Sequence, residues 1–459
     1  MDNWYERLST LDSFFLEIED RTAHMHVGAV AIFEGPPPPY RDLLALIGGR
    51  LEQVPRYRQR VMTVPFKQGR PVWIDETQFD LEYHVRQTAL PAPGGDAELK
   101  KLVGRLFSQA LDRDKPLWEM WLVEGLGDSR FAVVSKTHHC MLDGVSGVDL
   151  ATVLMDREPN PAPPPPPAPW TPRKAPKGPD LLFDSVKEQV SHPLRLAKQA
   201  LGSNGEAVKL LGQVFSGFKP LVEVVSMGLA PESALNVPIG PHRRFEMLEL
   251  PLAKLKAVRA KRRGTTVNDI LLATVAGGLR SWLTARGRPP AADLRVLVPV
   301  SMRTRKERGT YGNQVSAVFC PLPLTEPDPV ERLRKLHEEM MVVKKSGAAV
   351  GAHALSRLGD FAPPQLLAQA ARLQAVSRMF NLVVTNVPGP QFPLYLLGKR
   401  MLHCFPQVPL AAQQALGIAL LSYDGKVGVG LLGDADAARD LPDLAKAMDA
   451  SLEELHAAG

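Results

Sequence analysis

Cysteine is rare in this chain, and the few cysteines present are too far apart to form a recognisable set. They lie at Cys140, Cys320 and Cys404, and no two of them make a C-x-x-C pair. Disulfide-stapled secreted domains and zinc-binding modules carry cysteines in close sets, so neither class fits. The sequence therefore predicts reduced thiols and a cytoplasmic protein.

Long hydrophobic runs are also missing. A membrane-spanning helix needs about 20 predominantly apolar residues, and no stretch of this sequence reaches that length without charge. The opening residues, Met1–Arg7, lack the basic segment and apolar core of a signal peptide. Any contact with a membrane is therefore expected to be peripheral.

Charge of one sign is only slightly in excess. The sequence has 55 Lys and Arg residues against 49 Asp and Glu residues, a net charge of +6. Nucleic-acid-binding domains concentrate far more positive charge, so we expect no nucleic-acid partner. The small excess would suit anionic lipid or phosphate.

Proline is plentiful and divides the chain. With 459 residues the chain is too long for one ordinary core, and two domains are expected. A proline-rich tract at 159–179 cannot bury a core and favours an extended linker. We therefore predict domains at 1–158 and 236–459, joined by a linker and crossover helices at 159–235. The amphipathic pattern at 180–229 fits either helices facing a membrane or helices packed on their own domain.

The strongest candidate for chemistry lies where a predicted strand, residues 130–135, runs into a loop. His138 and His139 are followed by Asp143 and Gly144. Successive strand residues point to opposite faces, so the two histidines cannot easily reach the same atom. This argues against a two-histidine metal site and favours one histidine as a general base, with the other packed behind it. Asp143 would hold the loop or orient an imidazole, and Gly144 would let the chain turn.

The pattern His138-His139-x-x-x-Asp143-Gly144 resembles the HHxxxDG signature of the CoA-dependent acyltransferase superfamily, which includes chloramphenicol acetyltransferase and peptide-synthetase condensation domains. Other short motifs narrow the resemblance to the bacterial wax ester synthase/acyl-CoA:diacylglycerol acyltransferase family along nearly the whole chain. They are Met25–Gly28, Pro116–Trp118, Asn268-Asp269, Pro299–Arg303, Gly312–Gln314, Asn386–Pro390 and Ser422–Gly425.

This resemblance implies a fold and an activity. The fold would be α/β (α+β), with two chloramphenicol-acetyltransferase-like domains, each a mixed β-sheet flanked by helices, and an active-site tunnel at their interface. The activity would be that of an O-acyltransferase that moves a long-chain acyl group from acyl-CoA to a fatty alcohol or diacylglycerol. It would need no metal and no cofactor other than acyl-CoA as co-substrate. The protein would lie peripherally on the inner membrane face or on lipid inclusions.

The resemblance also implies roles for single residues. His139 would be the general base, with His138 supporting the loop and Asn268 acting as oxyanion donor or positioning the alcohol. The signature aspartate usually pairs with an arginine in this superfamily, which predicts an Asp143–Arg303 pair. The substrate-binding candidates are Gly144, Glu19, Pro116, Trp118 and Asp269.

Several of these residues have a purely structural alternative. Glu19 would otherwise be an exposed charge at a helix end, and Pro116–Trp118 a packing corner before a strand. Asn268 and Asp269 would otherwise cap a helix. The basic cluster Arg259–Arg263 either complements a helix dipole or holds the phosphates of coenzyme A.

Two patterns are misleading. The glycines Gly428, Gly430 and Gly433 fit G-x-G-x-x-G, but they follow a hairpin turn and lie within a predicted strand, so a dinucleotide site is not expected. Cys140 would be a nucleophile only if the reaction needed a covalent intermediate, and we expect it to be incidental.

Two other functions stay open at this point. One is a condensation-type acyltransferase that takes acyl groups from a carrier protein. The other is a non-catalytic lipid-binding protein.

Overall fold

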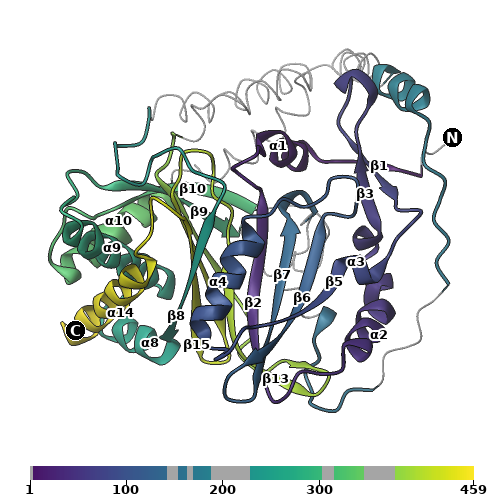
Figure 1. Ribbon diagram of the computed structural model, residues 1–459. Helices are drawn as coiled ribbons and strands as arrows, with labels where there is room; N and C mark the ends of the chain where they lie inside the picture. Colours follow the sequence, from purple (N-terminus) through teal and green to yellow (C-terminus); the bar gives the residue numbers. More distant parts are fainter. Residues whose placement is uncertain are drawn as a thin grey trace, which may run out of the picture.

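Two six-stranded sheets lie side by side in the computed structural model, with a small third sheet beyond the first (Figure 1). The structure describes residues 4–141, 153–162, 169–187, 228–301, 315–345 and 378–458. Asp143, Gly144 and Arg303 lie outside the described residues, as does most of the stretch 180–229. The small sheet contains β1 (Glu6–Arg7), β4 (Val72–Asp75) and β3 (Gln59–Met62).

The first large sheet carries the histidine pair. Its inner strands β2 and β7 pair antiparallel, β7 pairs antiparallel with β6, and β5 is parallel to β6. In order across the sheet the strands are β12 (Tyr395–Leu396), β13 (Lys399–Gln407), β2 (His26–Glu34), β7 (Arg130–His138), β6 (Trp118–Leu126) and β5 (Val85–Ala89).

The second large sheet is mixed. β11 runs parallel to both of its neighbours, and the other pairs are antiparallel. The order is β10 (Val315–Leu322), β9 (Leu294–Ser301), β11 (Leu382–Pro388), β14 (Leu416–Tyr423), β15 (Lys426–Asp434) and β8 (Arg243–Pro251). The predicted hairpin at Asp424-Gly425 joins β14 to β15.

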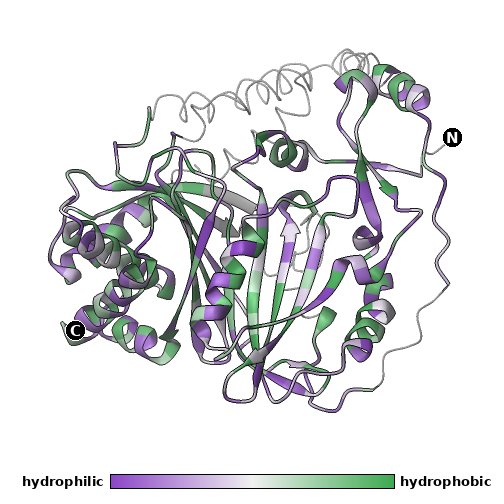
Figure 2. Cartoon of the chain, viewed as in Figure 1, coloured by the Kyte–Doolittle hydropathy of each residue, from purple (hydrophilic) through white to green (hydrophobic). Residues whose placement is uncertain are grey.

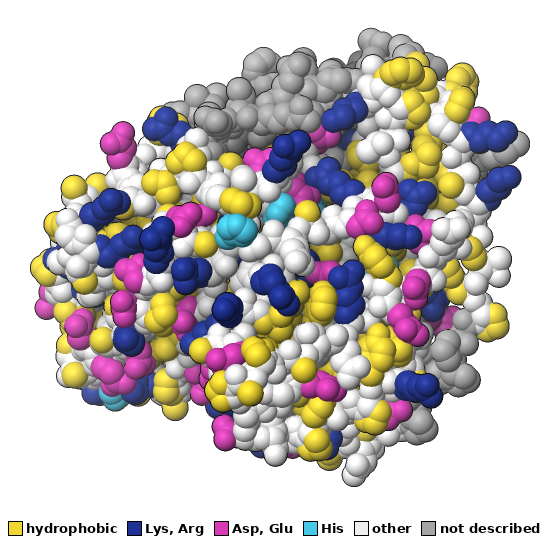
Figure 3. Space-filling model, viewed as in Figure 1, with side chains coloured by type: hydrophobic (Ala, Val, Ile, Leu, Met, Phe, Trp, Pro, Cys, Tyr) yellow, Lys and Arg dark blue, Asp and Glu magenta, His cyan; other side chains and the backbone are white. Residues whose placement is uncertain are grey.

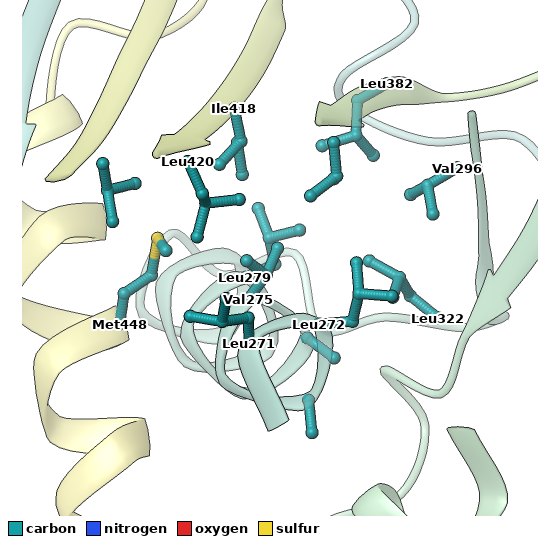
Figure 4. Close-up of a cluster of buried hydrophobic side chains, with 14 of the residues drawn as sticks. Leu271, Leu272, Val275, Leu279, Val296, Leu322, Leu382, Ile418, Leu420 and Met448 are labelled. Atoms are coloured by element: carbon teal, nitrogen blue, oxygen red, sulfur yellow. The ribbon is translucent and has the colours of Figure 1, made fainter. Parts of the chain in front are cut away.

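Helices cover the second sheet on one side. They are α8 (Leu252–Lys261), α9 (Val267–Ala285), α10 (Pro329–Lys345) and α14 (Leu441–Ala457). α9 is apolar over most of its circumference because it is enclosed by the sheet and the neighbouring helices. Figure 4 shows its leucines packed against strand residues such as Ile418 and against Met448 of α14.

The described helices of the first half are α1 (Thr10–Ile18), α2 (Tyr40–Arg50), α3 (Leu81–His84) and α4 (Asp96–Phe107). α4 lies between the two large sheets (Figure 1) and packs against β8. Lys100 of α4 pairs with Glu246 of β8, and the Arg243 amide donates to Ser108 Oγ at 2.8 Å. Figure 2 shows hydrophobic and hydrophilic residues along both the helices and the strands, as expected for elements with one face on a core. None of the helices in the described ranges is long and apolar enough to cross a bilayer.

The two large sheets are not each built from one continuous stretch of chain. β12 and β13 come from residues 395–407, yet they extend the first sheet beside β2. The sequence analysis predicted no strand in this region. The predicted mixed sheets with flanking helices are otherwise confirmed, while the domain boundaries at 158 and 235 stay a prediction.

The G-x-G-x-x-G pattern lies in β15, as expected, and has a packing role. A Cβ atom on Gly428 would overlap the carbonyl oxygen of Cys404, and one on Gly430 would overlap that of Pro406. Both carbonyls belong to β13. Glycine at alternate positions therefore lets the second sheet cross closely over the edge of the first.

Candidate active site

The end of β7 holds the two adjacent histidines in fixed positions. The His138 amide donates to Leu117 O at 2.9 Å, and the His139 amide donates to Met25 O at 2.8 Å. The chain then enters a short 3-10 turn, η4 (His139–Met141). Backbone contacts on both sides thus fix the strand end, and the two rings have different partners, as the strand geometry predicts.

His138 is directed into the protein. Its side chain is 1% exposed, and its Nε2 lies 3.0 Å from Glu19 Oε2. Its Nδ1 accepts a hydrogen bond from the Cys140 amide at 3.1 Å. A backbone N–H can only donate, so Nδ1 carries no proton and Nε2–H donates to Glu19. His138 is therefore held as a neutral imidazole with one defined tautomer.

Glu19 is the charged centre of this cluster. Its side chain is only 7% exposed, so the expectation of an exposed charge at a helix end is wrong. Arg113 Nη2 donates to its Oε2 at 2.6 Å, and ring nitrogens of His24 and His26 lie 3.7 and 3.6 Å from its Oε1. Burial alone would raise the pKa of Glu19, but the hydrogen bonds from His138 and Arg113, with His24 close by, outweigh it and hold that pKa well below the ordinary range. Glu19 is therefore a buried carboxylate.

His139 has a different environment. Its ring stacks on Phe15 of α1, with the ring centroids 3.8 Å apart and the planes 25° from parallel. Its Nδ1 is buried and has no hydrogen-bond partner among the residues that the structure describes. Burial lowers the pKa of His139 to about 4. At neutral pH the imidazole is uncharged and holds a free lone pair, which a general base requires.

The Pro116–Trp118 corner supports the histidine strand. Leu117 O receives the His138 amide, and the Trp118 indole N–H donates to Tyr57 O at 2.9 Å. The Trp118 ring is buried and stacks on His84. The packing role is thus present in the structure, while substrate contact by Pro116 and Trp118 stays a prediction.

Asn268 and Asp269 lie in the first turn of α9. Asp269 accepts from the Thr266 amide at 2.9 Å and lies 2.8 Å from His337 Nδ1, so it serves in a capping box. Asn268 Oδ1 accepts from Asn386 Nδ2 at 3.1 Å, leaving its own amide nitrogen without a partner among the described residues. The structure shows no contact between Asn268 and His139 within these ranges. Their roles toward substrate stay predictions.

Cys140 does not compete for a catalytic role. Burial raises the pKa of its thiol well above the usual value, so no thiolate is available at neutral pH. Within the described ranges no three His, Cys, Asp or Glu side chains are arranged to hold a metal ion.

Four neighbours of the histidine pair were not among the predicted site residues: Phe15, His24, His26 and Arg113. His26 lies inside the Met25–Gly28 motif and is opposite His138 in the β2–β7 register, so the motif could have indicated it. Arg113 reaches Glu19 across 94 positions of sequence, and no local pattern marks it.

Comparison with known proteins assigns this arrangement to a family. A model of the wax ester synthase/diacylglycerol acyltransferase catalytic domain matches residues 8–271, and one of the C-terminal domain of the same family matches residues 311–456. Mycobacterium tuberculosis has a protein named "Probable diacyglycerol O-acyltransferase tgs1" that is 33% identical over 98% of this chain and 95% of its own length. A second, named tgs2, is 34% identical over 97% of this chain and 98% of its own length.

Solved structures agree. The wax ester synthase/diacylglycerol acyltransferase from Marinobacter aquaeolei VT8 superposes with a TM-score of 0.70 at 28% identity, covering 98% of this chain and 99% of that one. The starter condensation domain of rhizomide synthetase, at 14% identity and a TM-score of 0.58 over 99% and 94% of the two chains, shows the fold alone. With family models matching both halves and relatives aligned along nearly its full length, this chain is an acyltransferase that belongs to the wax ester synthase/diacylglycerol acyltransferase family.

Proposed function

We propose that the protein transfers a long-chain acyl group from acyl-CoA to a fatty alcohol or diacylglycerol, with His139 as general base. The observation that carries the proposal is the half-buried, uncharged imidazole of His139, whose buried Nδ1 has no hydrogen-bond partner among the described residues. Buried polar atoms are nearly always hydrogen-bonded, so an unsatisfied one points to a partner supplied from outside the chain. A substrate hydroxyl is such a partner. The names of the relatives support these two acceptor classes.

The reaction needs no further cofactor. The hydroxyl proton passes to the free nitrogen of His139 while the hydroxyl oxygen attacks the thioester carbonyl carbon. The C–S bond then breaks, the carbonyl re-forms, and the departing thiolate takes the proton from the imidazolium, giving an ester and free coenzyme A. General-base assistance of this kind contributes about 10²–10⁴-fold.

Two side chains have supporting roles in the proposal. The amide nitrogen of Asn268 is a candidate donor to the oxyanion, which would lower the barrier further. His138 is held by Glu19 and Cys140 and therefore positions the loop that carries His139.

The test is acceptor-dependent release of thiol from palmitoyl-CoA by the purified protein, with hexadecanol or dipalmitoylglycerol as acceptor. His139→Ala should lose about 10²–10⁴-fold in rate, and His242→Ala, at an exposed position, should match the parent. Release from neither acceptor by folded protein would contradict the proposal. A carrier-bound donor would then be tried, and unchanged lipid binding without transfer would favour the non-catalytic alternative.

We also propose that the protein works peripherally at a lipid surface. Phe66 is 83% exposed and Phe183 is 69% exposed, which is unusual for aromatic side chains. Residues 65–69 pack against the helical segment 178–187, where Gly178 approaches Pro65. Figure 3 shows hydrophobic side chains gathered at this end of the molecule, at the upper right. This edge includes the described beginning of the stretch for which the sequence allowed membrane-facing helices.

A further inference from the structure

A pocket opens between the end of α8 and the beginning of α9, apart from the histidine cluster. Its volume is about 540 Å³, and its lining includes Lys256, Arg259, Arg263, Gly264, Thr265 and Thr266. Gly264 has a φ of +93°, which a residue with a side chain rarely adopts. This turn lets the basic end of one helix and the first turn of the next line the same hollow.

The three cations of the pocket have no ion-pair partner among the residues that the structure describes. On the same helix Lys254 behaves differently, because it pairs with Glu453 of α14. The dipole of α8 favours cations in its last turn and so accounts for Arg259. It does not account for Lys256, which lies a turn earlier, or for Arg263, which lies beyond the helix end. Like charges gathered around one hollow repel each other unless an anion lies between them.

The first turn of α9 adds neutral donors to these charges. The amides of Asp269 and Ile270 are bonded to Thr266, whereas those of Val267 and Asn268 have no recorded partner within the described ranges. Free amides at the positive end of a 19-residue helix attract anions. The Asp269 carboxylate does not oppose this, because it is 1% exposed and bonded to the Thr266 amide and His337.

From these contacts we infer that the α8–α9 pocket binds a phosphate-bearing anion. Guanidinium groups, an ammonium group and free helix amides form the donor set that phosphate oxygens prefer. Two sources carry this chemistry: the nucleotide end of a CoA thioester, which rests on the proposed function, and the headgroup of an anionic lipid. In either case the pocket binds the phosphate and leaves acyl-chain contacts to other parts of the protein.

The first experiment measures binding of adenosine 3′,5′-bisphosphate to the full chain by calorimetry. The double variant Arg259→Gln/Arg263→Gln should weaken binding about ten- to hundredfold, since each charged hydrogen bond is worth on the order of a tenfold change. Lys254→Gln removes a cation from the same helix outside the pocket and should change binding less than about twofold. Binding by the parent should also weaken as salt rises.

The second experiment separates the two sources with vesicles of phosphatidylcholine alone or with phosphatidylglycerol added. Loss of nucleotide binding in the double variant assigns the pocket to the CoA nucleotide. Unchanged nucleotide binding with a selective loss on phosphatidylglycerol vesicles assigns it to a lipid headgroup. If neither changes in the folded variant, the inference is overturned.

A truncated donor keeps this inference distinct from the proposed function. S-palmitoyl-N-acetylcysteamine lacks the nucleotide, so the double variant should raise KM for palmitoyl-CoA about tenfold and leave KM for the truncated donor unchanged. Equal increases with both donors would contradict the nucleotide assignment. If the parent transfers no acyl group at all, the proposed function fails, while the binding measurements still decide the pocket.

Discussion

The neighbouring rings of His138 and His139 differ in whether their nitrogens have hydrogen-bond partners. Both nitrogens of His138 are hydrogen-bonded within the protein, whereas Nδ1 of His139 is buried and has no partner in the described part of the chain. Occupied nitrogens fix a ring in place, and a free one can take a proton. The proposed division of roles between the two histidines rests on this difference in their contacts.

The pH dependence of the reaction should reflect the low pKa of His139, about 4 because burial disfavours the charged ring. The active form is the uncharged one, so activity is lost only as pH falls toward that pKa. Between pH 5 and 8, kcat/KM for palmitoyl-CoA should therefore be flat, with His139→Ala giving the background rate. An acidic limb with a midpoint near 6.5, the ordinary histidine value, would contradict this.

Replacing Glu19 by glutamine should impair catalysis without removing a substrate contact. The amide keeps one acceptor oxygen, but its NH₂ group can oppose the Nε2–H of His138 and favour the other tautomer, which breaks the bond from Cys140. We expect kcat to fall about 10- to 100-fold with KM for the donor within about twofold. Glu17→Gln on the same helix is the matched control, because Glu17 pairs with Lys67 outside the cluster. An unchanged kcat would show that Glu19 is only structural.

For single residues, the sequence predicts which side chains could carry chemistry better than it predicts which residues contact each other in the fold. Strand alternation was enough to predict that the two histidine rings have different surroundings. It could not predict that Glu19 is buried, because its partners Arg113 and His138 lie 94 and 119 positions away. A charge at a helix end is usually exposed, and only the fold supplies the three histidines and the arginine that keep this carboxylate buried.

At the scale of single elements, the crossing of β15 over β13 depends on glycine. An alanine at Gly430 would place a Cβ atom against the Pro406 carbonyl, and backbone on both sides leaves no flexible group to yield. We expect Gly430→Ala to lower the free energy of unfolding by about 1–3 kcal/mol, as overpacking typically does. Denaturant unfolding would measure it. Gly127→Ala, whose Cβ would meet only Gly94 O at 3.7 Å, should change stability little, and equal stability of both variants would contradict the argument.

The composition of β13 explains why this strand escaped prediction. β13 contains Pro406 and the polar residues Lys399, Arg400 and His403, a composition unlike that of a central strand. It tolerates them because its outer neighbour β12 covers only Lys399 and Arg400, leaving much of that edge unpaired. Elements with a strong period of their own were predicted: the helix that Asn268 and Asp269 would cap is α9, and the strand that contains Gly428 and Gly430 is β15.

At the scale of the whole molecule, two features join the two halves: strands β12 and β13 of the second half extend the first sheet, and buried polar contacts link the halves. Arg243 of β8 donates to the Thr22 carbonyl of the first half and lies 3.8 Å from Asp434 of the second. Length alone predicts two cores. The described residues form a large core in the second half, two clusters around the first sheet and a small cluster at the three-stranded sheet. Length could not predict that residues 395–407 return to the first sheet, because that pairing joins segments more than 360 positions apart.

The exposed side chains of Phe66 and Phe183 predict how the whole molecule binds to a lipid surface. Phe66 and Lys67 both have positive φ, at 57° and 54°, a costly conformation for residues with side chains. This turn presents Phe66 to solvent at 83% exposure. Each aromatic side chain buried in lipid would contribute about 1.5–3 kcal/mol, so Phe66→Ser/Phe183→Ser should weaken binding to phosphatidylcholine vesicles at least about tenfold.

Flotation of the parent and the double variant with vesicles would measure this effect. Phe392→Ser is the matched control, since Phe392 is 38% exposed and stacks under Arg157. Acyl transfer to a short, water-soluble alcohol should be the same in all three proteins, because none of the substitutions touches the histidine cluster. If the double variant floats as the parent does, the aromatic edge does not contact lipid, and the exposure of Phe66 must serve another partner.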